Sequence, residues 1–211
     1  GVMDEQKAFV LYQSLGFPWE ITNELCLDKG IRLDQTKFDA IFAKHKAGSK
    51  TASAGMFKGG LADSSETTTK YHTATHLLHQ ALYDVLGNTV AQAGSNITSE
   101  RLRFDYTFAG KPSPEELARI AQIVNAKIHA DLPVTKTIED KTKALASGAK
   151  AFFAEKYPEK VSVYTIGDYS RELCGGPHVE RTGVIGKIEI YKDEALGSGK
   201  RRIYAKLVSK E

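Results

Sequence analysis

Two histidines, His72 and His76, stand four residues apart in a stretch with helical periodicity. At 3.6 residues per turn they lie on one helix face, about 40° apart, so both imidazoles can bind one metal ion. No glutamate adjoins His72, which excludes the HExxH motif of metalloproteases. Such a pair is more often incidental than metal-binding, so the spacing alone is a weak indication of a metal site.

A second pair of candidate ligands, Cys174 and His178, lies a hundred residues downstream in the sequence CGGPH. Thiolate and imidazole are favoured zinc ligands, and the two glycines let the backbone turn tightly enough to aim both side chains at one point. The alternative is that Cys174 is a small buried apolar residue and His178 caps a turn. Together the two pairs supply a complete tetrahedral set, which predicts one zinc ion (Zn2+) per chain.

The remaining histidines are expected to lie outside this set. His79 follows His76 by one turn and can compete as a ligand, but it is expected to support a ligand from behind or to lie at the surface. His45 and His129 are isolated in the sequence and are expected on solvated faces.

The element that carries His72 and His76 has clear helix signals. Ser64, Ser65 and Thr67 are candidate N-caps, and Gly87 is a plausible stop. Its expected apolar face consists of Ala74, Leu78, Ala81, Leu82 and Val85.

The rest of the chain mixes helices and strands without a regular βαβ alternation. Strands are predicted at 101–108, 133–138, 161–166, 185–191 and 202–208, and helices at 114–128 and 139–147. The predicted fold class is therefore α+β, with a mixed or antiparallel sheet packed with helices and preceded by a small helical segment. The predicted organisation is a helical segment over 1–46 with breaks at Gly16, Pro18 and Gly30, a linker over 47–65, and a zinc-binding domain over 66–211.

Composition sets broad limits on the kind of protein. The net charge of +3 does not by itself indicate a nucleic-acid binder, and two cysteines do not make a disulfide scaffold in 211 residues. No apolar run approaches the ~20 residues that cross a bilayer. We therefore expect a cytoplasmic protein without a membrane partner, and the sequence gives no indication of its oligomeric state.

Several long motifs in this sequence resemble motifs of the editing domain of alanyl-tRNA synthetases. In order across residues 66–207 they are HTATHLLHQAL, QAGSNITSERLRFDY, IGDYSRELCGGPHVERTGVIGKIEI and RRI. The upstream word LYQSLGFPWEIT is similar to the helical stretch that precedes editing in this family. The resemblance covers nearly the whole chain and implies a fragment of an alanine–tRNA ligase that lacks the ATP-dependent aminoacylation site.

This resemblance implies a function and assigns residues to it. The implied activity is hydrolytic deacylation of tRNA(Ala) wrongly charged with serine or glycine, with the tRNA acceptor end and the other domains of the parent synthetase as partners. The family's zinc ligands fall on His72, His76, Cys174 and His178, and its editing pocket includes residues that match Thr75 and Gln92. Two departures are notable: Pro177 replaces a commoner threonine, and only about twenty residues stand where the family usually has a small β-rich subdomain before the HxxxH helix.

Roles for the pocket residues follow from their chemistry. Thr75 is expected to read the serine hydroxyl, unless its own hydroxyl bonds back to the preceding helical turn. Gln92 is expected to position a water or a ribose hydroxyl, or else to cap the turn before Ser95. Weaker candidates are Arg103, expected to pair with Asp105, and Asp168, expected to orient a ligand imidazole.

Three other functions stay open at this point. They are an editing domain that removes serine from tRNA(Thr), a free-standing deacylase that acts in trans, and, from another class, a non-catalytic zinc-bound tRNA-binding module. Because four protein ligands leave no open position on zinc, we expect the metal to orient the substrate rather than to generate hydroxide.

Overall fold

The computed structural model describes residues 3–15, 19–51, 60–152 and 157–208, without the side chains of 13–15 and 44–51. Contacts divide the chain into two compact units, Gly1–Gly55 and Met56–Glu211. The expected break at Gly16 and Pro18 lies outside the described residues. No helix in the described ranges has the length and apolar content needed to cross a membrane.

The first unit is helical, as expected. It contains α1 (Glu5–Leu15), α2 (Trp19–Leu27) and α3 (Gln35–Thr51). Phe38 packs against Trp19 and Phe9, with ring centroids 4.4 and 6.2 Å apart. Helix α3 extends to Thr51, so the first five residues of the stretch expected to be a linker are helical, and residues 52–59 lie outside the described ranges.

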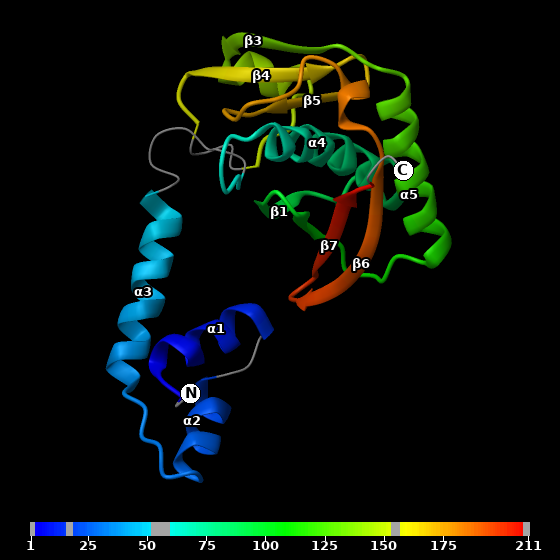
Figure 1. The fold of residues 1–211 in the computed structure, drawn as a ribbon. Helices are drawn as coiled ribbons and strands as arrows, with labels where there is room; N and C mark the ends of the chain where they lie inside the picture. Colours follow the sequence, from blue (N-terminus) through cyan, green and yellow to red (C-terminus); the bar gives the residue numbers. More distant parts are fainter. Residues whose placement is uncertain (1–2, 16–18, 52–59, 153–156, 209–211) are drawn as a thin grey trace. The chain divides into compact units, whose positions relative to one another are not determined.

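The second unit combines helices with two antiparallel sheets and confirms the α+β prediction (Figure 1). In chain order it contains α4 (Glu66–Leu86), β1 (Gln92–Ile97), β2 (Leu102–Thr107), α5 (Pro114–His129), β3 (Val134–Asp140), α6 (Lys141–Ala146), β4 (Lys160–Ile166), β5 (Ser170–Leu173), the 3-10 helix η2 (Thr182–Ile185), β6 (Ile188–Gly197) and β7 (Lys200–Leu207). The strand orders are β1-β2-β7-β6 and β3-β4-β5. One sheet was predicted, but β3, β4 and β5 form a sheet of their own, while the β6–β7 hairpin pairs with β2.

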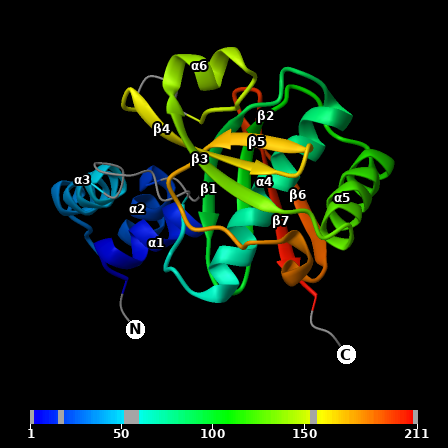
Figure 2. The same ribbon diagram turned by 90° about the horizontal axis from the view of Figure 1, so that it is seen from above.

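Helix α4 lies between the two sheets, with α5 beside it (Figures 1 and 2). The Ser65 hydroxyl accepts a hydrogen bond from the Thr68 amide at 3.3 Å, and Gly87 ends the helix at a φ of 100°, so two of the predicted helix signals are used. All residues from 71 to 79 are buried, on every side of the helix. Polar groups in this stretch must therefore find partners inside the protein.

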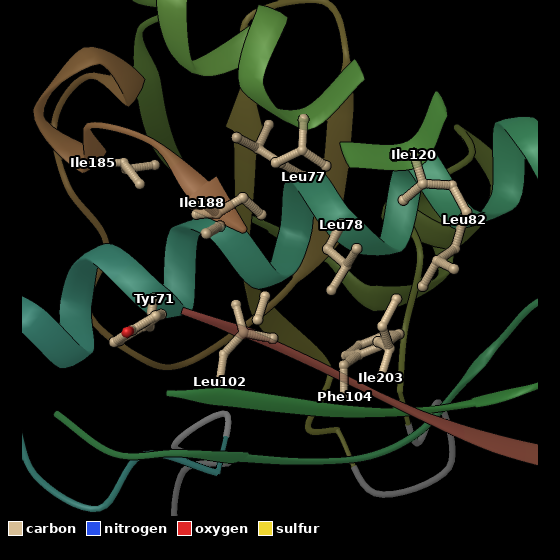
Figure 3. Close-up of a cluster of buried hydrophobic side chains, with 14 of the residues drawn as sticks. Tyr71, Leu77, Leu78, Leu82, Leu102, Phe104, Ile120, Ile185, Ile188 and Ile203 are labelled. Atoms are coloured by element: carbon tan, nitrogen blue, oxygen red, sulfur yellow. The ribbon is translucent and has the colours of Figure 1, made fainter. Parts of the chain in front are cut away.

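The main core forms around the apolar side of α4 (Figure 3). Leu77, Leu78 and Leu82 are fully buried and face Phe104 and Ile203 of the four-stranded sheet or residues of α5. Side chains on the other side of α4 are consequently held against β5 and the segment that follows it.

Helix α5 supports α4 and begins with a capping box. Ser113 Oγ accepts from the Glu116 amide at 3.1 Å, and Glu116 Oε2 accepts from the Ser113 amide at 2.7 Å. We expect Ser113→Ala to lower the free energy of unfolding by about 1 kcal/mol, because an amide at the helix start loses its acceptor. Urea unfolding would measure this, with Ser99→Ala at an exposed position as the control. Equal stability of the two variants would contradict the prediction.

Candidate metal centre

Four potential ligands converge in the second unit. His72 and His76 come from α4, and Cys174 and His178 come from the segment that follows β5. Their ligand atoms all lie within 4.8 Å of one another, and Cys174 Sγ is 3.4 Å from His72 Nε2. The His178 ring centroid lies 4.2 Å from that of His72 and 4.4 Å from that of His76. The structure thus brings together the four residues that the sequence analysis proposed as ligands.

The Nδ1 atoms of two of the histidines face acceptors away from the centre. His72 Nδ1 lies 2.8 Å from the carbonyl oxygen of Pro177 and donates to it. His178 Nδ1 lies 3.2 Å from Thr73 Oγ1, which also accepts from the Val179 amide at 3.1 Å. With the proton assigned to Nδ1 in both rings, the Nε2 lone pairs are available at the centre.

The donor set fits a zinc-type ion. His178 Nε2 is buried and has no hydrogen-bond partner among the described residues, which is costly unless another group binds it. Three imidazole nitrogens and one sulfur match the preference of zinc and lack the oxygen ligands that calcium and magnesium require.

The electrostatic environment keeps the imidazoles neutral. Burial, aided by neighbouring His76, lowers the pKa of His72 to about 3, and burial also lowers the pKa values of His76 and His178. Burial raises the pKa of the Cys174 thiol to about 12. A bound cation would offset that last effect by stabilising the thiolate, so the set is suited to a metal ion rather than to a free reactive thiol.

Gly176 allows the turn to pass close to the first ligand. A Cβ atom at this position would lie 2.4 Å from His72 Cε1 and 2.9 Å from its Nδ1. The next residue, Pro177, contributes its main-chain carbonyl to His72. Because every residue has this carbonyl, the proline side chain does not alter that contact.

A small pocket, partly open to solvent, is lined by three of the four candidate ligands, His72, His76 and Cys174, and by both predicted pocket residues. Thr75 and Gln92 line it together with Phe152 and Glu172. Both residues also make the local hydrogen bonds that were considered as alternatives to a role in the pocket. The Thr75 hydroxyl donates to the Tyr71 carbonyl at 2.8 Å, and Gln92 Nε2 donates to Ser95 Oγ at 3.2 Å. Each side chain is therefore held by one local hydrogen bond while it faces the pocket.

Neither of the two weaker candidates lines this pocket. Arg103 lies on β2 on the opposite face from Phe104, which contacts His79 of α4, and its Nε is 3.6 Å from Asp105 Oδ1. The expected pairing with Asp105 therefore occurs away from the pocket. Asp168 is exposed in the turn between β4 and β5. Strand β5 separates this turn from Cys174, so the role of Asp168 in orienting a ligand stays a prediction.

A carboxylate that the sequence analysis missed, Glu172, lies behind the ligands. It is buried on β5, with Oε1 3.1 Å from His79 Nδ1 and Oε2 3.8 Å from His76 Nδ1. Burial alone would raise its pKa, but His76, His79 and Lys150 lower it to about 2. Its position two residues before Cys174, on the same strand face, was the available signal. His79 is likewise buried rather than at the surface.

Comparison with known proteins identifies relatives of this chain. The family described as "Threonyl and Alanyl tRNA synthetase second additional domain" matches residues 161–204. The alanine–tRNA ligase of Treponema pallidum (strain Nichols) is 52% identical over 198 residues, which are 94% of this chain and 33% of that protein. For the alanine–tRNA ligase of Treponema denticola (strain ATCC 35405) the identity is 50% over 206 residues, or 98% of this chain and 34% of that protein.

A third relative matches over less of the chain. The alanine–tRNA ligase of Shouchella clausii (strain KSM-K16) is 54% identical over 136 residues, which are 64% of this chain and 16% of that protein. The chain spans about a third of the length of the two Treponema relatives. Over nearly all of its length it is thus homologous to one segment of the alanine–tRNA ligases, a segment that carries the second additional domain of threonyl and alanyl tRNA synthetases.

Proposed function

We propose that this chain hydrolyses the ester bond of tRNA(Ala) that carries serine or glycine, as the editing part of an alanine–tRNA ligase. The observation that carries the proposal is that three members of the four-residue metal-ligand set line one pocket with Thr75 and Gln92. The proposed partners are the acceptor end of tRNA and the other domains of the ligase, and the proposed location is the cytoplasm.

Editing has a physical reason in an enzyme that selects alanine. A site that fits alanine cannot strongly exclude glycine, since one missing methyl is worth only about 1–3 kcal/mol. It also discriminates poorly against serine, which adds only a hydroxyl. A second site that requires the hydroxyl can remove serine while it spares alanine, because its polar group stays unpaired when alanine binds.

The hydrogen bond of Thr75 defines how it would read serine. Its hydroxyl proton is already donated to the Tyr71 carbonyl, so its oxygen is available as an acceptor. A serine hydroxyl would donate to this oxygen, and alanine has no such donor. Selection by Thr75 thus rests on an acceptor that the helix backbone has oriented in advance.

The ester is broken by attack of water on its carbonyl carbon, which releases the amino acid and frees the ribose hydroxyl. Because the amide NH2 of Gln92 is bonded to Ser95, its carbonyl oxygen is the group that would accept from the attacking water or from a ribose hydroxyl. When bound by all four side chains, zinc would supply fixed positive charge that orients the polar groups of the substrate.

Deacylation assays with the purified chain test this proposal. We expect seryl-tRNA(Ala) to be hydrolysed much faster than alanyl-tRNA(Ala), and the proposal fails if seryl-tRNA(Ala) survives as long as in buffer. Faster hydrolysis of seryl-tRNA(Thr) would instead favour the threonyl branch, which the matched family includes. Binding of tRNA without hydrolysis would favour the non-catalytic module.

Thr75→Val tests the reading of serine. We expect kcat/KM for seryl-tRNA(Ala) to fall roughly 5- to 150-fold, corresponding to about 1–3 kcal/mol for an unpaired hydroxyl, with little change for alanyl-tRNA(Ala). The matched control is Thr69→Val, because Thr69 makes the same kind of bond to the preceding turn, to the Ser65 carbonyl, and does not line the pocket. If both variants lose the same activity, the effect belongs to the helix and not to serine recognition.

A further inference from the structure

A buried carboxylate connects two histidines of α4 behind the metal-binding set. The exposed fraction of Glu172 is 5%, and its two oxygens face different rings: Oε1 lies 3.1 Å from His79 Nδ1 and Oε2 lies 3.8 Å from His76 Nδ1. Among the described residues, His76 Nδ1 is buried without a hydrogen-bond partner, and Glu172 Oε2 lies 3.8 Å from it. Glu172 is therefore placed to accept a hydrogen bond from the Nδ1–H group of His76 after a small shift of either side chain.

His79 fixes the carboxylate in this position. A carboxylate only accepts hydrogen bonds, so His79 donates its Nδ1 proton to Oε1. The His79 ring packs against Phe104 of β2 with centroids 5.4 Å apart, and Ser170 Oγ reaches the same carboxylate oxygen at 3.4 Å. Glu172 is thus held from the core side of α4 and from its own strand.

We propose that Glu172, supported by His79, is a positioning residue that directs Nε2 of His76 toward the metal and so sets the affinity of the site for a divalent ion. This inference deepens the proposed function, on whose metal site it rests. A carboxylate that accepts the second N–H of a ligand imidazole fixes its tautomer and ring orientation and makes the metal-binding nitrogen more basic.

Charge balance gives an independent reason for this carboxylate. A divalent ion bound by three neutral imidazoles and one thiolate leaves a net charge of one positive unit in a buried site. Isolated buried charge is unfavourable, and the Glu172 carboxylate beside His76 neutralises it. The divalent ion, its four ligands and Glu172 together would carry no net charge.

Glu172→Gln tests the proposal on the full chain, because it keeps the shape of the side chain and removes its charge. We expect zinc affinity, measured by competition with a chelator in the absence of tRNA, to fall about 10- to 100-fold. Glu189→Gln is the matched control, since Glu189 is an exposed carboxyl group on β6. Affinity within about twofold of that control would overturn the proposal.

The same substitution in a His76→Ala background separates positioning from a general structural effect. If Glu172 acts through His76, its replacement should cost several-fold less affinity once His76 is gone, whereas an equal loss in both backgrounds would overturn the proposal. If Glu172→Gln fails to fold, the Glu172→Asp variant tests the positioning role instead. It keeps the charge but withdraws the carboxylate by one methylene, and we expect weaker Co2+ binding with a changed absorption spectrum. Unchanged affinity and spectrum would overturn the proposal.

These readouts are separate from the proposed hydrolysis. A chain whose zinc affinity depends on Glu172 but which leaves seryl-tRNA(Ala) intact would support the positioning role and contradict the editing function. If the chain hydrolyses seryl-tRNA(Ala) but binds zinc equally well as wild type and as Glu172→Gln, the editing function would be supported and the positioning role contradicted.

Discussion

Replacing Cys174 by alanine is expected to lower the zinc affinity of this chain at least a hundredfold and to leave it nearly free of zinc after dialysis against a chelator. Structural zinc binding is worth about 10–16 kcal/mol, so one ligand of four contributes roughly 3 kcal/mol, or two orders of magnitude in affinity. Cys174 should account for at least this share, because it is the only ligand in the set that becomes an anion. Under the proposed function, hydrolysis of seryl-tRNA(Ala) falls with the metal content.

Cys26→Ala is the matched control for this experiment. Cys26 is the other cysteine of the chain, it is also buried, and it belongs to the helical unit. Metal content per chain, measured by elemental analysis, should drop for Cys174→Ala only. Full zinc occupancy in Cys174→Ala would exclude this cysteine as a ligand.

Gly176→Ala is expected to damage the site without removing any ligand. The new Cβ would lie 2.4 Å from His72 Cε1, so either the imidazole leaves the Pro177 carbonyl and Cys174 or the turn moves. We expect a loss of about 1–3 kcal/mol in unfolding free energy from overpacking, and a fall in zinc affinity of roughly a hundredfold if His72 is displaced. Thermal unfolding and chelator competition on the same sample would measure both.

Gly110→Ala provides the comparison for Gly176→Ala. A Cβ at Gly110 would approach no closer than 3.1 Å, to Phe108 Cε1, and would meet none of the candidate ligands. Zinc affinity should be unchanged in this variant. If Gly176→Ala binds zinc as tightly as Gly110→Ala does, the turn tolerates a side chain and the close approach to His72 is not required.

The parts of the fold that were predictable carry strong local signals. Helix α4 has an N-cap at Ser65, a stop at Gly87 and an apolar stripe, and all three agree with the structure. Strand β2 alternates between Leu102, Phe104 and Tyr106, which are buried, and more polar neighbours. In each case the local sequence and the tertiary environment favour the same structure.

Other parts depend on contacts between distant segments. Strand β1 has the sequence QAGSNI, which contains few residues with strand preference, and it forms through pairing with β2. The division into two sheets is equally non-local, because strand partners are chosen by long-range pairing. The place of Asp168 is also set by strand pairing, because the β4–β5 hairpin puts this residue in its turn, with β5 between it and Cys174.

The candidate site divides in the same way. Residue type and spacing suggested each pair of ligands, and the family resemblance supplied Thr75 and Gln92. The signal for Glu172 in its own segment, its place two residues before Cys174, was weak, because a glutamate between Arg171 and Leu173 also has the pattern of an exposed strand position. Only the packing of α4 against β5 turns that carboxylate toward His76 and His79.

The convergence of the ligands also bears on how the chain reaches its fold. His72 and Cys174 are separated by 102 residues, so the unfolded chain presents two separate ligand pairs and never the complete set. A metal ion bound by all four closes that loop as a covalent cross-link would, and a closed loop of about 100 residues corresponds to an entropy difference of about 4–5 kcal/mol in the unfolded chain. The ion would therefore stabilise the one topology of the second unit that brings the two ligand pairs together, rather than any local element.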